Sequence, residues 1–225
     1  MSVLRLDGRS LTLADLAPIL RGAGPRLELA PAALERVRAA RGLVERALDS
    51  GKPIYGLTTG FGKLKSVFIE RADLGRLQEN LVLSHCCGMG EPMPREEVRV
   101  VQLLRLNKLL RGNSGVRIEL VQALARLFEK GFVPVVPQQG SVGASGDLAP
   151  LAHIAAACMG HGEAWVGSER LPARAALAKV GEAPLALEAK EGLALINGTE
   201  VICAIGAGVV LRAQNLSKCA DAIAA

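Results

Sequence analysis

Aromatic side chains are scarce in this sequence: they make up 3% of its 225 residues, with one tyrosine and one tryptophan. Apolar residues nevertheless account for 50% of the chain, so leucine, valine and alanine must fill the core. A core of this composition favours helices packed on helices. We therefore predict a mainly α fold.

Cysteine and histidine are also few. The five cysteines are odd in number and show no repeated paired spacing, which argues against a disulfide framework. The three histidines do not combine with them at the offsets that a zinc site needs. We predict free, buried thiols and no metal ion. The N-terminus has no basic region followed by an apolar run, so a cytoplasmic location is expected.

The sequence also lacks long apolar runs and concentrations of one charge. Its longest uninterrupted apolar stretch, 201–211, is too short to span a bilayer. The net charge is +5, but in 35–49 arginines are mixed with acidic residues, which predicts a solvated helix face. Basic residues interleaved with aromatics, as in nucleic-acid binding, are not found. We therefore predict neither a membrane nor a nucleic acid as partner.

Apolar periodicity and turn residues predict the elements. Helices are expected at 31–50, 70–85, 95–111, 116–130 and 147–159, with two more before a long final helix from residue 199. Asp7-Gly8 in an alternating stretch predicts a hairpin at 3–12, and a second hairpin is expected at 162–171. The glycine-rich segments 53–69 and 138–146 are long, and long ordered loops are often functional.

The expected final helix is apolar nearly all round and contains Gly206 and Gly208. A helix of this kind is buried on every side. Because 225 residues can hardly surround it, we expect a longer chain, an oligomer, or both.

The run from Gly143 to Leu151, Gly-Ala-Ser-Gly-Asp-Leu-Ala-Pro-Leu, is the strongest candidate for chemistry. A serine hydrolase elbow needs Gly-x-Ser-x-Gly after a strand, but Asp147 replaces the last glycine and Pro137 interrupts the preceding strand. A phosphate-binding loop needs Gly-Lys-Ser/Thr, which is not there. Taken alone, Ser145 or Asp147 is typical of a helix cap.

The eight residues 144–151 resemble the signature of the ammonia-lyases that carry a 4-methylidene-imidazol-5-one (MIO) group. The resemblance implies that the amide nitrogen of Gly146 attacks the carbonyl carbon of Ala144 and that two waters leave, one from the side chain of Ser145. Glycine permits this close approach in a strained turn. The N-terminus of the next helix would stabilise negative charge on the ring. The ring would be the cofactor, with no metal or diffusible cofactor.

A second segment, Tyr-Gly-Leu-Thr-Thr-Gly-Phe-Gly at 55–62, resembles the Tyr-Gly-x-x-Thr-Gly-Phe-Gly loop of the same family. The resemblance implies that Tyr55 is the catalytic base, since a base must sit on a positioned loop near the substrate. The alternative is a tyrosine whose ring anchors the loop.

Two further segments match the family in the same order. Ser84-His85 resembles the pair carried by histidine-specific members, which implies that both residues contact the substrate, with His85 at its imidazole. A histidine in a helical segment is otherwise usually structural. Asn197-Gly198-Thr199 matches the family's Asn-Gly-Thr and implies that Asn197 binds near the ring or the substrate carboxylate. Asn197 is alternatively a cap of the final helix.

The resemblance thus implies the histidine ammonia-lyases, which convert L-histidine to trans-urocanate and ammonia. Residues 1–198 would form an N-terminal MIO-bearing domain with small β hairpins, and 199–225 would begin a central helical bundle. The family's chains are longer and form homotetramers, and the part not represented here supplies a second tyrosine, an arginine and a glutamate. We expect this chain alone to be weakly active or inactive. A phenylalanine or tyrosine ammonia-lyase, an aminomutase of the same family, and a catalytically inert fragment stay open.

Overall fold

The computed structural model describes residues 2–54, 56–60, 69–143 and 146–225. Within them the helices are α1 Leu13–Ile19, α2 Pro31–Asp49, the 3-10 helix η2 Arg71–Asp73, α3 Leu74–Ser84, α4 Arg95–Leu109, α5 Ile118–Glu129, α6 Leu148–Cys158, α7 Ala173–Lys179, α8 Glu191–Ile196 and α9 Glu200–Ala224. The strands are β1 Val3–Leu6, β2 Arg26–Leu29, β3 Met89–Pro92, β4 Phe132–Pro134, β5 Pro137–Gln139, β6 Glu163–Val166 and β7 Glu169–Pro172. The mainly α prediction is confirmed.

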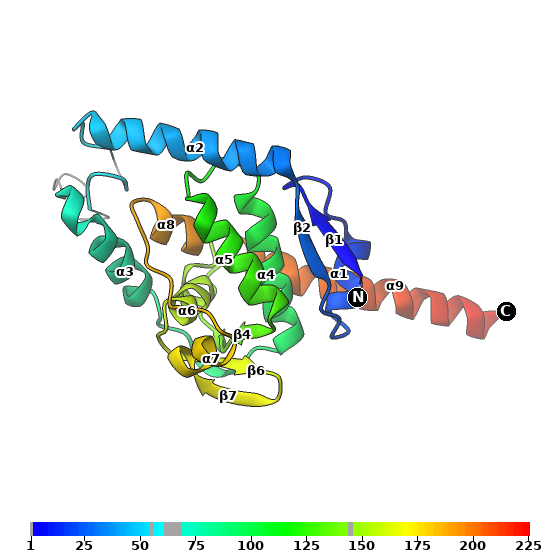
Figure 1. The fold of residues 1–225 in the computed structure, drawn as a ribbon. Coiled ribbons are helices and arrows are strands. Elements are labelled where there is room, and N and C mark those ends of the chain that lie inside the picture. Colours follow the sequence, from blue (N-terminus) through cyan, green and yellow to red (C-terminus); the bar gives the residue numbers. More distant parts are fainter. Residues whose placement is uncertain (1, 55, 61–68, 144–145) are drawn as a thin grey trace.

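Helix α4 lies at the centre of the molecule, where it contacts α1, α5 and α9 (Figure 1). Helix α5 shows why these segments form helices that pack together. Its buried residues Leu120, Val121, Leu127 and Phe128 recur at helical spacing and form one apolar face. Burying such a face against neighbouring helices supplies most of the stability of a helix of this length.

The hairpin predicted at 3–12 is wrong. Strand β1 pairs instead with β2, in parallel, and Leu6 lies opposite Leu29. Helix α1 intervenes because Thr12 starts it: the N–H of Thr12 donates to the carboxylate of Asp15 at 2.8 Å, as in a capping box. Parallel strands need such a crossover connection.

The hairpin predicted at 162–171 is confirmed. Strands β6 and β7 pair in antiparallel register, and β4 adds to the other edge of β6. The guanidinium of Arg95, at the start of α4, lies 5.0 Å from the ring centroid of Trp165 in β6. This cation–π contact ties the small sheet to the helical core.

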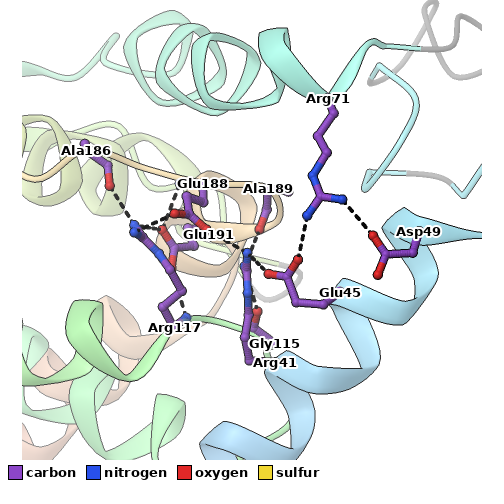
Figure 2. Close-up of polar contacts among 10 residues, drawn as sticks. All are labelled: Arg41, Glu45, Asp49, Arg71, Gly115, Arg117, Ala186, Glu188, Ala189 and Glu191. Carbon is purple, nitrogen blue, oxygen red and sulfur yellow. Dashed lines mark hydrogen bonds and ion pairs between the residues drawn. The ribbon is translucent and has the colours of Figure 1, made fainter.

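Ion pairs hold the segment before α8 against α2 and α5 (Figure 2). Arg117 donates to Glu191 at 2.7 Å and to Glu188 at 2.8 Å. Arg41 of α2 donates to Glu188 at 2.8 Å and to the carbonyl of Ala189 at 3.0 Å. The prediction of a solvated face along 35–49 is therefore wrong at Arg41, whose side chain is 11% exposed. This cluster fixes where α8 begins.

The C-terminal part of helix α9 extends away from the rest of the chain, whereas its N-terminal part packs against α4 (Figure 1). Its buried residues are Glu200, Val201, Ala204 and Gly208. Its exposed large apolar residues are Ile202, Ile205, Val209, Val210, Leu216 and Ile223. Within this chain the helix is not buried on every side, which agrees with the expectation that 225 residues can hardly surround it. The stretch Glu191–Ala224, which joins α8 and α9, is long and apolar enough to cross a membrane by length and composition, a property that core helices of soluble proteins share.

The prediction of buried thiols holds for Cys158 alone. Cys86 is half-buried, and Cys87, Cys203 and Cys219 are exposed. Two of the exposed thiols lie on α9, so their exposure has the same origin as that of its apolar residues.

Candidate active site

Of the tripeptide predicted to form the ring, the structure describes Gly146. Ala144 and Ser145 lie outside the described residues, as does Tyr55. Gly146 is buried and has a φ of 152°, which residues with a side chain rarely adopt. A Cβ at this position would lie 3.2 Å from Oδ1 of Asn197. The backbone conformation therefore favours glycine and the space beside it is tight, and two segments distant in sequence meet here.

Asp147 connects the glycine-rich loop to α9. It occupies the N-cap position of α6, as the alternative interpretation of the motif predicts, but its side chain makes no capping hydrogen bond there. Its fully buried carboxylate instead accepts the backbone N–H groups of Val201 and Ile202, each at 3.2 Å, and the hydroxyl of Ser141. The carboxylate thus satisfies N–H groups in the first turn of α9, which have no partner within that helix.

Asn197 lies between α8 and α9. It is the C-cap residue of α8, whereas Thr199 holds the N-cap position of α9, so the alternative prediction that Asn197 caps the final helix is wrong. The main-chain carbonyl of Asn197 accepts hydrogen bonds from Lys108 at 2.6 Å and Arg105 at 3.1 Å. Its side-chain oxygen is the atom nearest to the missing Cβ of Gly146.

Ser84 and His85 lie at the C-terminal end of α3. The Oγ of Ser84 donates to the carbonyl of Leu81 at 2.9 Å, and Nδ1 of His85 lies 2.8 Å from the same carbonyl. Because a carbonyl only accepts, Nδ1 carries the proton in this arrangement and Nε2 is left as an acceptor. The ring of His85 is half-buried. It is thus oriented by its own helix and presents an acceptor nitrogen.

The segment after His85 is joined to the loop that leads into Gly146. Strands β3 and β5 pair in antiparallel register, with Met89 opposite Gln139. The N–H of Gly88 donates to Nε2 of His153 on α6 at 3.1 Å. A Cβ on Gly140 would lie 3.2 Å from Cα of Gly88, so the two backbones are in close contact. The structure therefore links the His85 segment and the Gly146 loop.

The described residues beside Tyr55 form a closely bonded turn. The hydroxyl of Thr58 accepts the N–H of Ile54 and donates to the carbonyl of Lys52, both at 2.7 Å. Thr58 and Thr59 are buried. On the far side of the segment Arg71 pairs with Asp49 at 2.7 Å (Figure 2). Hydrogen bonds and an ion pair thus hold described residues on either side of Tyr55 and of 61–68.

The sequence patterns did not identify the charged residues of α4 that approach the site. Arg105 and Glu200 form a buried ion pair at 2.7 Å, and Lys108 lies beside them. Burial lowers the pKa of Arg105 and of Lys108. Arg105 occupies the apolar register of α4, seven positions after Val98, and a charge at such a position is the signal that would have revealed it.

Comparison with known proteins identifies the family. The sequence model of the aromatic amino acid lyases matches residues 11–225. The chain belongs to the aromatic amino acid lyase family. It is 53% identical to a histidine ammonia-lyase of Gloeobacter violaceus over 97% of this chain and 42% of that protein. It is 48% identical to a histidine ammonia-lyase of Bacillus subtilis over 99% of this chain and 44% of that protein.

Solved structures of the same family share the fold. The crystal structure of histidine ammonia-lyase from Trypanosoma cruzi matches with a TM-score of 0.90 and 38% identity, over 98% of this chain and 42% of the other. Tyrosine aminomutase from Streptomyces globisporus matches with a TM-score of 0.86 and 33% identity, over 95% and 40%. The chain therefore spans less than half the length of the family members that it matches.

Proposed function

We propose that this chain is part of a histidine ammonia-lyase, which converts L-histidine to trans-urocanate and ammonia with an MIO group formed from Ala144-Ser145-Gly146. The observation that carries the proposal is the position of Gly146, buried with its backbone in a glycine-only conformation against the side chain of Asn197. Relatives named histidine ammonia-lyase at about half identity support it.

The described residues fit such a group. Gly146 presents a backbone nitrogen with no Cβ beside it, and Asn197 offers an amide within contact distance of that position. Helix α6 begins at Leu148, two residues after Gly146, so its positive end lies next to the predicted ring. Donors and dipoles fixed in this way stabilise negative charge that develops during a reaction.

The proposed roles of the side chains follow from their chemistry. The MIO group supplies an electrophile that makes the amine of the substrate a better leaving group. Tyr55 would remove a proton from the β-carbon, which is weakly acidic and needs a positioned base. His85 would accept a hydrogen bond at Nε2 from the imidazole of the substrate, with Ser84 beside it. Asn197 would bind near the ring or the substrate carboxylate.

The intact mass of the purified chain tests this proposal. The wild-type chain should weigh two waters less than its sequence, and Ser145→Ala should retain its full mass because it has no hydroxyl to eliminate. A wild-type chain at full mass would count against ring formation in the chain as it stands. Conversion of histidine is then measured on the same samples, and we expect it to be weak or undetectable because less than half of the relatives' length is present.

The nearest alternatives lie in the same family. A tyrosine aminomutase shares the fold at 33% identity. Ser84-His85 favours histidine, and substrate profiling separates the possibilities: turnover of phenylalanine or tyrosine in preference to histidine would overturn the choice of substrate. A second candidate is a catalytically inert fragment that acts by association, which the exposed apolar residues of α9 favour. Turnover by the 225-residue chain would refute it.

We also propose that the protein acts as a cytoplasmic homotetramer, with residues 1–198 as the MIO-bearing domain and 199–225 as the start of a central helical bundle. The exposed apolar side chains of α9 support this assembly, because several large apolar side chains exposed on one helix are typical of an interaction site. Sedimentation of the chain measures the association directly.

A further inference from the structure

Charged side chains of α4 hold the turn that carries Asn197. Arg105 donates from Nη1 to the carbonyl of Asn197 at 3.1 Å and from Nη2 to Glu200 at 2.7 Å. Its Nη1 also donates to the carbonyl of Ala194 at 3.0 Å. Lys108 donates from Nζ to the same Asn197 carbonyl at 2.6 Å and lies 3.4 Å from Glu200. The Asn197 carbonyl thus accepts two charge-assisted hydrogen bonds, which are stronger than neutral ones.

The glycine-rich loop holds the next residues of the same turn. The N–H of Asp147 donates to the carbonyl of Gly198 at 2.7 Å. Its carboxylate accepts the N–H groups of Val201 and Ile202. The turn is therefore bonded to α4 through the main chain of Asn197 and to the loop through that of Gly198. Loss of the hydrogen bonds to the carbonyl of Asn197, or of the bond to the carbonyl of Gly198, would move the Asn197 side chain relative to Gly146.

The cluster is charge-balanced, and its members are buried except for Lys108, which is 39% exposed. Arg105 and Lys108 supply two positive charges, and Glu200 and Asp147 supply two negative ones. The side chains of Arg105 and Glu200 are 4% and 8% exposed. Buried charges persist when they are paired, and charge-assisted hydrogen bonds to a backbone carbonyl favour one arrangement of the groups they join; Nε of Arg105 has no partner among the described residues. This cluster is suited to fixing a backbone turn.

We propose that Arg105 and Lys108 are positioning residues for ring formation: by holding the Asn197 carbonyl they fix the Asn197 side chain against Gly146. This inference rests on the proposed function. In the reaction the Gly146 nitrogen bonds to the Ala144 carbon. The Ala144 oxygen leaves as water with the amide hydrogens of Gly146 and Ser145, and the Ser145 hydroxyl leaves as a second water with its own Cα hydrogen. Among the described residues, Arg105 and Lys108 bond to the main-chain carbonyl of Asn197, so we infer that they act through Asn197.

Lys108 provides the sharper test, because loss of Arg105 would leave the buried Glu200 without its main partner. Lys130 is a matched control: each lysine is 39% exposed, and each pairs with a largely buried glutamate, Glu200 at 8% and Glu182 at 12% exposed. Lys130 lies at the C-cap of α5, outside the site. The variants are Lys108→Met, Lys108→Arg and Lys130→Met, with circular dichroism to confirm the fold.

The readout is the fraction of molecules that have lost two waters, followed over time by intact mass. We expect Lys108→Met to form the ring about ten- to a hundredfold more slowly, as displacement of a reacting group by up to about 1 Å does. Lys108→Arg should recover most of the rate, since its guanidinium can donate to the same carbonyl. Lys130→Met should match wild type. Equal rates in Lys108→Met and wild type would overturn the inference.

A wild-type chain that keeps its full mass would count against the proposed function rather than against the positioning. Hydrogen exchange at the Asp147 amide then decides, because this N–H reports on the bond to Gly198. We expect exchange at least about tenfold faster in Lys108→Met than in Lys130→Met, as for a locally opened hydrogen bond. Equal exchange in the two variants would refute the role of Lys108.

Discussion

The backbone N–H of Asp147 donates a hydrogen bond of 2.7 Å to the carbonyl of Gly198. This bond joins the residue after the predicted ring tripeptide to the turn after α8. The carboxylate of Asp147 then reaches the first turn of α9. A single residue therefore couples the loop to the start of two helices, and the geometry of the site depends on it.

Asp147→Asn should destabilise the chain by about 2 kcal/mol. The hydrogen bonds to the buried carboxylate are charge-assisted, and asparagine lacks the charge. Its amide nitrogen would also be a donor placed where the carboxylate oxygen accepts an N–H or a hydroxyl. Urea unfolding measures this change. Asp221→Asn on the exposed end of α9 is the matched control and should change stability by less than about 0.5 kcal/mol. Equal unfolding midpoints for the two variants would contradict the role assigned to Asp147.

Gly146→Ala should prevent loss of the two waters, because an added Cβ meets Oδ1 of Asn197 at 3.2 Å and the φ of 152° disfavours any side chain. Gly143→Ala is the control for backbone strain alone. Gly143 has a φ of 107°, but an added Cβ would meet nothing within 4 Å. We expect Gly143→Ala to lower stability by about 1–2 kcal/mol and still to form the ring. Intact mass distinguishes the two outcomes. Ring formation in Gly146→Ala would show that the close approach of Asn197 to residue 146 does not exclude a side chain there.

Local patterns in the sequence predicted most of the helices to within a few residues. Pro31 at the first turn and Gly51 after the last turn mark α2, and the apolar spacing in 116–130 marks α5. The hairpin expected at 162–171 is also present. The partner of β1 could not be predicted from local patterns. Its pairing with β2 depends on how α1 folds back, which no local pattern records.

The motifs located Gly146 and Asn197, but their contact is a tertiary feature. Sequence spacing also could not reveal that Asp147 serves a helix more than fifty residues away, or that Arg105 faces inward. Lys190, which has a φ of 78° and precedes the buried Glu191, shows the same limit: the packing of its surroundings, rather than its own preference, sets its conformation. Roles for Tyr55, Ser84 and His85 rest on the family resemblance and stay predictions.

Arg117→Met should destabilise the chain by about 3 kcal/mol, because it leaves the fully buried carboxylate of Glu191 unpaired. Arg38→Met is the control: Arg38 pairs with Glu35 on the surface, where both side chains are more than half exposed, and its loss should cost less than about 1 kcal/mol. Urea unfolding compares the two. The double variant Arg117→Met with Glu191→Gln removes the buried charge and keeps one acceptor for the N–H groups of Arg117 and Glu188, so it should recover part of the loss. No recovery would mean that the unpaired charge of Glu191 is not the cause.

His153 should make stability depend on pH. Burial lowers the pKa of His153 below its ordinary value of 6.5, and Nε2 accepts the N–H of Gly88 in the neutral form. The unfolded chain therefore binds a proton at this histidine before the folded chain does. The contribution of neutral His153 to the free energy of unfolding is fully present above pH 6.5 and is lost as the pH falls through the pKa of the folded chain.

His153→Gln keeps an acceptor near Gly88 but cannot titrate. The free energy of unfolding of this variant, measured by urea at several pH values from 7.5 downwards, should fall less below pH 6.5 than that of wild type. Titration of the His153 ring protons by NMR gives the folded pKa directly. A value at or above 6.5 would contradict the prediction.

The five cysteines should react with a thiol reagent in two classes. Burial raises the pKa of Cys158 to about 12 and that of Cys86 to about 11, and the thiolate is the reactive form. Cys87, Cys203 and Cys219 are exposed. In the dissociated chain at pH 8, Ellman's reagent should therefore modify these three thiols rapidly and the other two more slowly, and association through α9 should slow Cys203 and Cys219. Cys87→Ser should remove one rapid thiol and leave the slow class unchanged, whereas five thiols reacting at one rate in the folded chain would contradict the burial of Cys86 and Cys158.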